Sequence, residues 1–505
     1  MKSITAHLVT FSILILLLSS AINAQQEDFT RGQIIEKVVC KADPTQSYAL
    51  YLPSTYSTSK KWPIIYCFDP MARGSFPLTR FKDAAEKYGY IIVGSNNSRN
   101  GPDVPLSNIV RTWFQDTSIR LAIDDRRVYT AGFSGGARVA CSVGHSYQGG
   151  IQGVIACGAG FPPQLTPSRS IPFVLFGTIG SEDFNYAEMK ELDETLDGAA
   201  IPHRIEVFEG GHDWANSEMS GKAIEWMEIQ AMKSLRRSKD ETLIGELFGK
   251  ATSEARSLES ANRKYEAYLA YNSLLDFKGL KDVSEFEKKV TELKESREVK
   301  QAVKEDREQV AEQRRRITEI YMLRAKLRNS REATLTGEAP APQSSNQGPA
   351  ISDVRSPTIY DGDPRHLIVS DIKRRLNDLK KRANAKDASP ERATARRILN
   401  QYLAYSFETA QIFFLSKKYD LAISHLSVES EIQPDNPRLF YNLACAYSLG
   451  GDKKKALETL KKAVQKGYSN IAELNASEAL APLRQEESFQ KIIDQIREQQ
   501  NKSKS

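Results

Sequence analysis

Short apolar runs alternate with longer amphipathic segments over the first half of the chain. The runs are rich in β-branched and aromatic residues, which predicts β-strands; they occupy residues 36–40, 48–52, 62–68, 90–93, 127–133, 153–157, 171–176 and 203–208. Segments with helical character lie between them, and a last one at residues 217–236 closes the series. Strands that alternate with helices predict an α/β domain over residues 25–236, built on a mostly parallel, doubly wound sheet.

The chain from residue 238 onward has no strand-like runs and is rich in Glu, Lys, Arg, Ala and Leu. Its periodicity predicts helices over residues 241–275 and 283–329, within a helical region that spans 237–330. A thin apolar seam in the second segment has nearly heptad spacing, but charged residues interrupt it. We therefore expect a long solvated helix rather than a coiled coil.

A repeat with a period of 34 residues appears near the C-terminus. Its first copy has Ala410, Leu415, Ala422, Ile423 and Leu426, and its second has Ala444, Leu449, Ala456, Leu457 and Leu460. The period and the small residues where two helices touch resemble the tetratricopeptide repeat. Residues 363–499 are thus expected to form a helical repeat domain, completed by helices at 366–383 and 475–498. The resemblance implies binding of a peptide or protein; the alternative is a scaffold that only stabilises or dimerises the chain.

Two further segments differ in composition from the domains. Residues 331–362 contain a run of Gly, Pro, Ser, Asn and Gln that is typical of a flexible linker. At the N-terminus, Lys2 precedes an apolar run at 11–18 and small residues at 19–24. This pattern predicts a cleaved secretory signal over residues 1–24 and an exported protein, with a retained membrane anchor as the alternative. No later run is long enough to span a membrane.

Composition narrows the function further. The chain has 505 residues, with 70 basic and 64 acidic residues interleaved, so no surface for nucleic acid is expected. The five cysteines have no spacing typical of a metal site or a redox pair. They are Cys40, Cys67, Cys141, Cys157 and Cys445. We expect most of them to be buried as small hydrophobic residues, and a disulfide involving Cys141 and Cys157 stays open.

One motif carries candidate chemistry. Residues 132–136 read Gly-Phe-Ser-Gly-Gly, between a predicted strand and a small-residue helix. This is the pattern of a nucleophile elbow, in which glycines allow a tight turn that exposes the serine oxygen. Ser134 is therefore the candidate nucleophile; the alternative is a structural turn with a solvated hydroxyl.

Two loops that follow predicted strands supply candidate partners for Ser134. Ligands of such sheets bind at the carboxyl ends of the strands. The loop at 177–183 ends in Asp183, and the loop at 209–214 contains His212. Serine, acid and histidine thus occur in the chain order of an α/β-hydrolase triad. Glu182 and Asp213 compete with Asp183 for the role of the acid.

These residues resemble the secreted esterase group of α/β-hydrolases, which includes feruloyl and acetylxylan esterases and polyhydroxyalkanoate depolymerases. The resemblance covers residues 30–235 and rests on Asp125-x-Arg127-Val-Tyr before the elbow, the acid loop that starts with glycine, and Gly210-Gly-His212-Asp-Trp. It implies a serine nucleophile, a histidine base and an acid that orients the histidine, with no metal or organic cofactor.

The predicted oxyanion hole departs from that group. The strand at 62–68 is followed by Asp69-Pro70-Met71 instead of the usual His-Gly. Because Pro70 has no N–H, the two backbone donors are expected from Gly135 and Met71, or less favourably Ala72.

Only residues 158–170 separate two predicted strands, which leaves no room for a cap domain there and favours an open cleft. Trp113 and Trp214 are candidates to line it, or else fill the core.

The favoured function is an exported serine hydrolase that cleaves carboxylic esters, including polymeric ones, with a repeat module for a protein partner. Two alternatives stay open. The same triad cleaves amides in serine peptidases, and an inactive hydrolase domain would leave a repeat-based binding protein. Because the hydrolase closes its own sheet before residue 237, a fragment over 25–330 is expected to hydrolyse small esters as well as the whole chain does.

Overall fold

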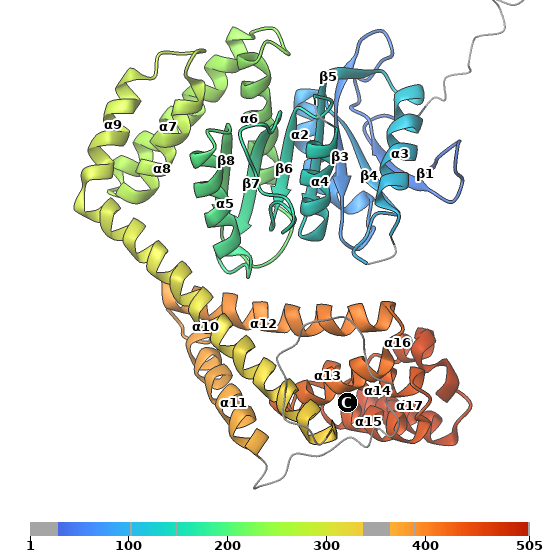
Figure 1. Ribbon diagram of the computed structural model, residues 1–505. Coiled ribbons are helices and arrows are strands. Elements are labelled where there is room, and N and C mark those ends of the chain that lie inside the picture. The colour runs from blue at the N-terminus through green and yellow to red at the C-terminus, as the bar shows by residue number, and fades with distance from the viewer. Residues whose placement is uncertain (1–28, 102–103, 148, 337–363, 388, 503–505) are drawn as a thin grey trace, which may run out of the picture.

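An eight-stranded mixed sheet organises the first part of the chain, with strand order β1-β2-β4-β3-β5-β6-β7-β8 (Figure 1). The computed structural model describes residues 29–101, 104–147, 149–336, 364–387 and 389–502. The strands are β1 (Ile34–Val39), β2 (Ser47–Tyr51), β3 (Trp62–Phe68), β4 (Ile91–Ser95), β5 (Ile123–Phe133), β6 (Gly153–Cys157), β7 (Val174–Gly180) and β8 (His203–Phe208). Only the pairs that involve β2 are antiparallel. The predicted α/β class is confirmed.

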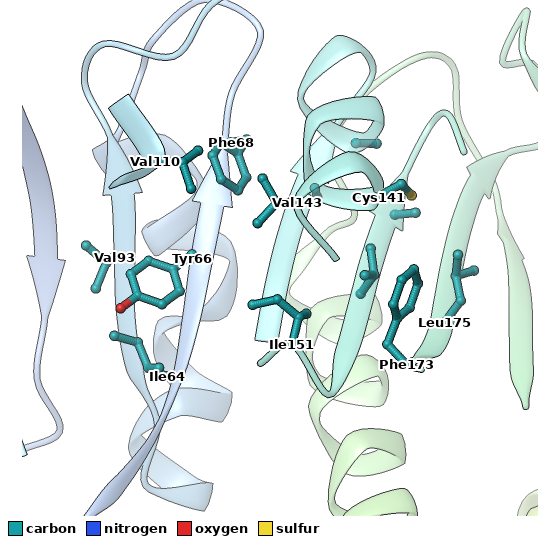
Figure 2. Packing of buried hydrophobic residues seen from close by; sticks show 14 of the residues in the cluster. Ile64, Tyr66, Phe68, Val93, Val110, Cys141, Val143, Ile151, Phe173 and Leu175 are labelled. Atoms are coloured by element: carbon teal, nitrogen blue, oxygen red, sulfur yellow. The ribbon is translucent and has the colours of Figure 1, made fainter. Parts of the chain in front are cut away.

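Helices cover both faces of this sheet. They are α2 (Ser75–Tyr88), α3 (Leu106–Arg120), α4 (Gly135–Ser146), α5 (Tyr186–Gly198) and α6 (Ser217–Lys233). Alternate side chains of the buried strand β3 enter two different cores, because successive residues of a strand point to opposite faces. Ile64, Tyr66 and Phe68 belong to one core with residues of α3 and α4 (Figure 2). Ile65 and Cys67 belong to the other, with residues of α2 and α6.

All five cysteines are buried and free, so no disulfide joins Cys141 and Cys157. Burial raises the pKa of both thiols. They fill the core as small apolar side chains, which is the role expected for most of the cysteines.

The helical region between the sheet and the C-terminal helices is more divided than the sequence suggested. It consists of α7 (Glu241–Ser260), α8 (Lys264–Leu274), a 3₁₀ turn η1 (Leu275–Phe277), α9 (Ser284–Glu295) and α10 (Arg297–Thr336). The helix expected over 241–275 breaks at Asn262, whose φ of 57° is left-handed. The helix expected over 283–329 breaks at Ser296, whose backbone is extended. Asn tolerates the left-handed conformation better than most residues, which explains the first break.

The C-terminal part is entirely helical where it is described. Its helices are α11 (Pro364–Ala383), α12 (Pro390–Leu415), α13 (Tyr419–Ile432), α14 (Pro437–Leu449), α15 (Lys453–Gln465), α16 (Ile471–Ala476) and α17 (Glu487–Lys502), with a 3₁₀ segment η2 (Glu478–Leu483). The single helix expected over 475–498 is interrupted, since Ser477 is extended and Pro482 lies inside η2. Four alanines of the predicted repeat are at most 1% exposed in one shared core: Ala410, Ala422, Ala444 and Ala456.

The predicted linker over 331–362 lies mostly outside the described residues, although residues 331–336 still belong to α10. The predicted signal over residues 1–24 lies entirely outside them. Within the described ranges, no helix is both long and apolar enough to cross a membrane.

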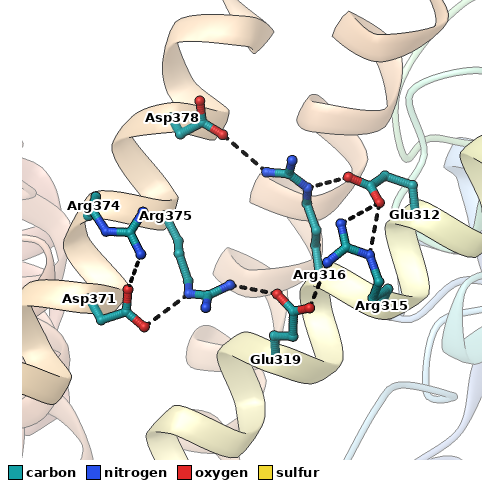
Figure 3. A network of polar contacts seen from close by, with 8 residues as sticks. All are labelled: Glu312, Arg315, Arg316, Glu319, Asp371, Arg374, Arg375 and Asp378. Atoms are coloured by element: carbon teal, nitrogen blue, oxygen red, sulfur yellow. Dashed lines mark hydrogen bonds and ion pairs between the residues drawn. The ribbon is translucent and has the colours of Figure 1, made fainter.

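The long helix α10 joins the two halves of the molecule. Ion pairs link it to α11, including Arg316 with Asp378 at 3.1 Å and Arg375 with Glu319 at 2.5 Å (Figure 3). Figure 1 shows α12 lying between the sheet and the helices α13–α17. The carboxyl end of β7 contacts α12 there, through Arg397 Nε and the carbonyl oxygen of Ser181 at 2.6 Å.

Candidate active site

Ser134 occupies a strained turn between β5 and α4. Its φ of 53° and ψ of −120° lie in a region that a residue with a side chain rarely adopts. Glycines make the turn possible: a Cβ on Gly132 would lie 2.1 Å from the Gly136 carbonyl oxygen, and one on Gly136 would lie 2.0 Å from the Phe68 carbonyl oxygen. The Ser134 N–H donates to the Cys157 carbonyl at 2.8 Å. The turn is thus held rigidly, with the serine at the start of a helix and partly exposed.

The structure brings His212 and Asp183 together. His212 Nδ1 lies 2.9 Å from both carboxylate oxygens of Asp183, which is fully buried. Asp183 also accepts a hydrogen bond of 2.8 Å from the Asn185 N–H. The imidazole packs between two aromatic rings, at 4.6 Å from Phe133 and 4.1 Å from Phe184 between centroids. With Nδ1 bound to the carboxylate, Nε2 is the nitrogen left to act on a substrate or nucleophile.

The two competing carboxylates have other partners. Glu182 accepts hydrogen bonds from Arg396 at 2.7 and 2.8 Å. Asp213 accepts from the Trp214 N–H and lies 3.9 Å from Arg80. Among the three acids considered from the sequence, Asp183 is therefore the one placed against the imidazole.

The residues predicted to supply the oxyanion hole, Gly135 and Met71 or Ala72, lie in two different segments of the chain. Gly135 directly follows Ser134 and begins α4. The Met71 N–H already donates to Asp69 Oδ1 at 2.8 Å, and the Ala72 N–H donates to the Asp69 carbonyl at 3.1 Å. A different group lies against Gly135: a Cβ there would be 1.9 Å from Asn100 Oδ1 and 2.8 Å from Asn100 Nδ2. The sequence pattern gave no sign of Asn100, because the loop after β4 belongs to no motif.

Asp69 is a second polar residue that the sequence analysis did not single out as functional. Its side chain is fully buried and accepts hydrogen bonds from Arg73 Nε at 3.0 Å and Arg73 Nη2 at 2.8 Å. It also accepts one of 2.9 Å from Trp214 Nε1, so it ties the loop after β3 to the loop that carries His212. Burial raises the pKa of this carboxyl, but the hydrogen bonds from Arg73, Trp214 and Met71 outweigh burial and hold the pKa below its usual value.

Both candidate tryptophans are core residues. Trp113 and Trp214 are each 2% exposed. Trp113 packs edge-on against Tyr66 and Phe68, with centroids 5.0 and 5.4 Å apart. Their positions favour the core-filling alternative over contact with a substrate.

The site is bordered by more than the domain that contains the sheet. As expected, no cap domain separates β6 from β7. However, α12 reaches the site from the C-terminal half, since Arg396 and Arg397 contact the loop that carries Asp183. At its other end, Leu415 Cδ1 would lie 3.6 Å from a Cβ on Gly101, in the same loop as Asn100. The short 158–170 connection predicted an open site, whereas in the structure α12 borders it, which the sequence did not predict.

In the part of the chain that the structure describes, no group of three or more His, Cys, Asp or Glu side chains is placed to hold a metal ion. The described chain thus offers an acid in contact with an imidazole, and a serine in a strained turn. A serine in reach of such an imidazole can attack a carbonyl, and the imidazole then returns the proton to the leaving group.

Known proteins resemble this chain in structure over part of its length. No model of a known protein family matches the chain, and no curated protein matches it. A ferulic acid esterase is 20% identical with a TM-score of 0.32, over 38% of this chain and 95% of its own. The S-formylglutathione hydrolase of Staphylococcus aureus is 14% identical with a TM-score of 0.32, over 40% and 99%. The fluorophosphonate-binding serine hydrolase F of Staphylococcus aureus is 15% identical with a TM-score of 0.33, over 39% and 99%.

Proposed function

We propose that this protein is an exported serine hydrolase that cleaves carboxylic esters. The observation that supports the proposal most strongly is the contact of His212 Nδ1 with Asp183 at 2.9 Å. It accompanies a serine in a strained strand-to-helix turn, as a nucleophile elbow requires. The order of serine, acid and histidine along the chain agrees with this assignment.

In the proposed reaction, Ser134 Oγ attacks the ester carbonyl while His212 Nε2 takes the hydroxyl proton. Asp183 holds the imidazole in the tautomer that carries its proton on Nδ1 and stabilises the imidazolium that forms. The tetrahedral intermediate then expels the alcohol, which receives the proton from His212. A water molecule, deprotonated in turn by His212, attacks the acyl-enzyme; the bond between the acyl carbon and Ser134 Oγ then breaks, Oγ takes the proton back from His212, and the carboxylic acid is released.

The oxyanion of the intermediate needs at least two donors. The Gly135 N–H, at the first residue of α4, is the first. Met71 remains a candidate for the second, but its N–H would have to leave the Asp69 carboxylate. The Asn100 carboxamide lies against Gly135 without such a conflict, and we favour it as the second donor.

Export and the repeat module belong to the same proposal. Export rests on the signal-like residues 1–24, and no part of the site requires a cofactor. The alanine-lined core of α12–α15 supports helical repeats of the tetratricopeptide type, for which a protein partner is expected.

The proposed substrates are esters, and polymeric esters are compatible with a site at the edge of the sheet.

The test uses the full chain, a fluorophosphonate probe and a panel of short esters with matched amides. Wild type is expected to label at Ser134 and to hydrolyse the esters. Ser134→Ala removes the nucleophile, and kcat is expected to fall by about 10⁶-fold if the triad acts as a unit.

Ser142→Ala serves as the matched control, since its hydroxyl is bound to the Arg138 carbonyl on the same helix, away from the turn. It is expected to keep wild-type turnover. A Ser134→Ala protein with the turnover of the control would overturn the proposal, and faster cleavage of the amides would identify a peptidase instead.

A further inference from the structure

The loop that carries Asp183 is held from outside the hydrolase domain. Arg397 Nε on α12 donates to the Ser181 carbonyl at 2.6 Å. Gln313 Nε2 on α10 donates to the Phe184 carbonyl at 2.8 Å. Arg396 on α12 binds both oxygens of Glu182 at 2.7 and 2.8 Å. The helices therefore bind the residues on both sides of Asp183.

The contact continues into the helix that follows this loop. The Arg397 guanidinium lies 3.5 Å from the centroid of the Tyr186 ring, and the Tyr186 hydroxyl donates to Asp306 of α10 at 2.7 Å. Arg397 is 5% exposed and Gln313 is 1% exposed. Burying a guanidinium and a carboxamide is costly unless fixed partners compensate for the lost water. Arg397 Nη1 and Gln313 Oε1 are buried without a hydrogen-bond partner among the described residues, so Arg397 Nε and Gln313 Nε2 depend on the two loop carbonyls, which favours one position of the loop.

The domain that contains the sheet also contributes hydrogen bonds to this loop. The Glu182 N–H donates to the Gly210 carbonyl at 2.8 Å, and Asn185 Nδ2 donates to the Gly158 carbonyl at 2.8 Å. Asp183 is thus positioned jointly by the sheet and by the helices α10 and α12.

Further along, α12 reaches a second loop of the site. Leu415, the last residue of the helix, has its Cδ1 3.6 Å from the place of a Cβ on Gly101. The helix therefore crosses the site from the acid loop to the loop of Asn100.

We propose that α10 and α12 are part of the catalytic apparatus, with Arg397 as a positioning residue that acts through the Asp183 loop. This rests on the proposed function. Arg397 and Gln313 fix the two carbonyls that flank Asp183, and so fix the carboxylate against His212. A displacement of about 1 Å at such a distance from the reacting atoms is enough to cost up to about 100-fold in rate.

The test compares full-length variants with wild type on a short soluble ester. Arg397→Met, which keeps much of the side-chain volume but removes all donors, is expected to lower kcat by about 10- to 100-fold with little change in KM. Arg397→Lys keeps one donor toward Ser181 and is expected to recover part of kcat. Arg438→Met is the matched control, because it removes an exposed arginine of α14 that pairs with Glu473 of α16, away from the site.

A second readout does not depend on activity. Hydrogen exchange of the peptide that contains residues 181–186 is expected to speed up in Arg397→Met and to stay at the wild-type rate in Arg438→Met. If Arg397→Met does not fold, Arg396→Gln takes its place, since Arg396 is half-buried and pairs with Glu182 only at the rim of the loop.

The outcomes separate the two proposals. Wild type that neither labels nor hydrolyses esters overturns the proposed function, while faster loop exchange in the variant still supports the positioning role. A folded variant with unchanged kcat and unchanged exchange overturns the positioning role and leaves the proposed function intact.

Discussion

At the scale of single residues, Asp69 explains why the loop after β3 differs from an ordinary oxyanion loop. Its buried carboxylate accepts from Arg73, from Trp214 Nε1 and from the Met71 N–H. The loop is thereby stabilised, and the Met71 N–H is occupied by the Asp69 carboxylate. The proposed second oxyanion donor is therefore the side chain of Asn100, beside Gly135.

Asn100→Ala tests this directly. If the carboxamide stabilises the oxyanion, kcat on a short ester is expected to fall by about 10²- to 10³-fold, as for the loss of one oxyanion donor. Asn108→Ala, which removes an exposed amide paired with Arg111 on α3, is the control. Steady-state kinetics and the rate of fluorophosphonate labelling both report the effect. If Asn100→Ala keeps the wild-type kcat, the second oxyanion donor would be the Met71 N–H instead.

The order of the strand ends made one contact of the site predictable from sequence, that between Asp183 and His212. Asp183 and His212 each lie in a loop directly after a strand, so the order of strands alone brings them to one edge, and the structure places them in contact. Asn100 and Asp69 could not be identified in that way. The hydrogen bond between Asp69 and Trp214 spans 145 positions, and nothing local marks either partner. The catalytic roles themselves remain predictions.

At the scale of elements, the interrupted seam of α10 has a simple explanation. Val299 and Val303 belong to a core with α7–α9, whereas Ile317 and Ile320 belong to a core with α11 and α12. Val310, between them, packs against the core of the sheet. Because one helix serves three cores in turn, its apolar residues need not form one continuous stripe. The sequence predicted a long solvated helix because charged residues interrupt the seam; the structure instead packs the helix against all three cores, so that it joins the two halves.

A second element-scale feature is the buried charge that joins β5, α6 and the chain after α6. Glu228 on α6 is fully buried and pairs with Arg127 and Arg237. It also accepts from the Tyr90 hydroxyl, at the residue before β4. Burial and the nearby carboxylate raise the pKa of Tyr90 well above its usual range, so its hydroxyl stays a donor. These contacts fix the sheet edge where α6 docks.

Removing this carboxylate should be costly. Glu228→Ala leaves two arginines without their buried partner, and the free energy of unfolding is expected to fall by about 3–5 kcal/mol. Glu246→Ala is the control, because it removes an exposed partner of Lys87, a pair worth at most about 1 kcal/mol. Urea unfolding followed by circular dichroism measures both. Equal midpoints for the two variants would show that the buried pair does not stabilise the fold.

At the scale of the whole molecule, the two halves are less independent than the sequence suggested. The predicted boundary at residues 236–237 lies where the sheet closes and where the composition changes. Both of these signals are local in sequence. The contacts of Arg396, Arg397 and Gln313 with the loop at 181–184 join residues more than a hundred positions apart. No periodicity or motif encodes such pairs, so α12 could not be assigned to the site from sequence. The same helix contributes Ala410 to the repeat core, which couples that core mechanically to the Asp183 loop.

The activity of a fragment over residues 25–330 shows whether the first half of the chain acts alone or needs the C-terminal helices. The sequence alone predicts that it matches the whole chain on small esters. The structure leads us to expect a kcat/KM lower by about 10- to 100-fold, because the fragment keeps Gln313 but loses both arginines that hold the Asp183 loop. It also exposes Ile317 and Ile320, which α11 and α12 cover in the full chain, so circular dichroism must first establish that the fragment is folded. Residues 364–502 supplied as a separate chain should restore part of the activity. A folded fragment with the kcat/KM of the whole chain would show that the helices govern only the location of the enzyme or its partner, and not the chemistry.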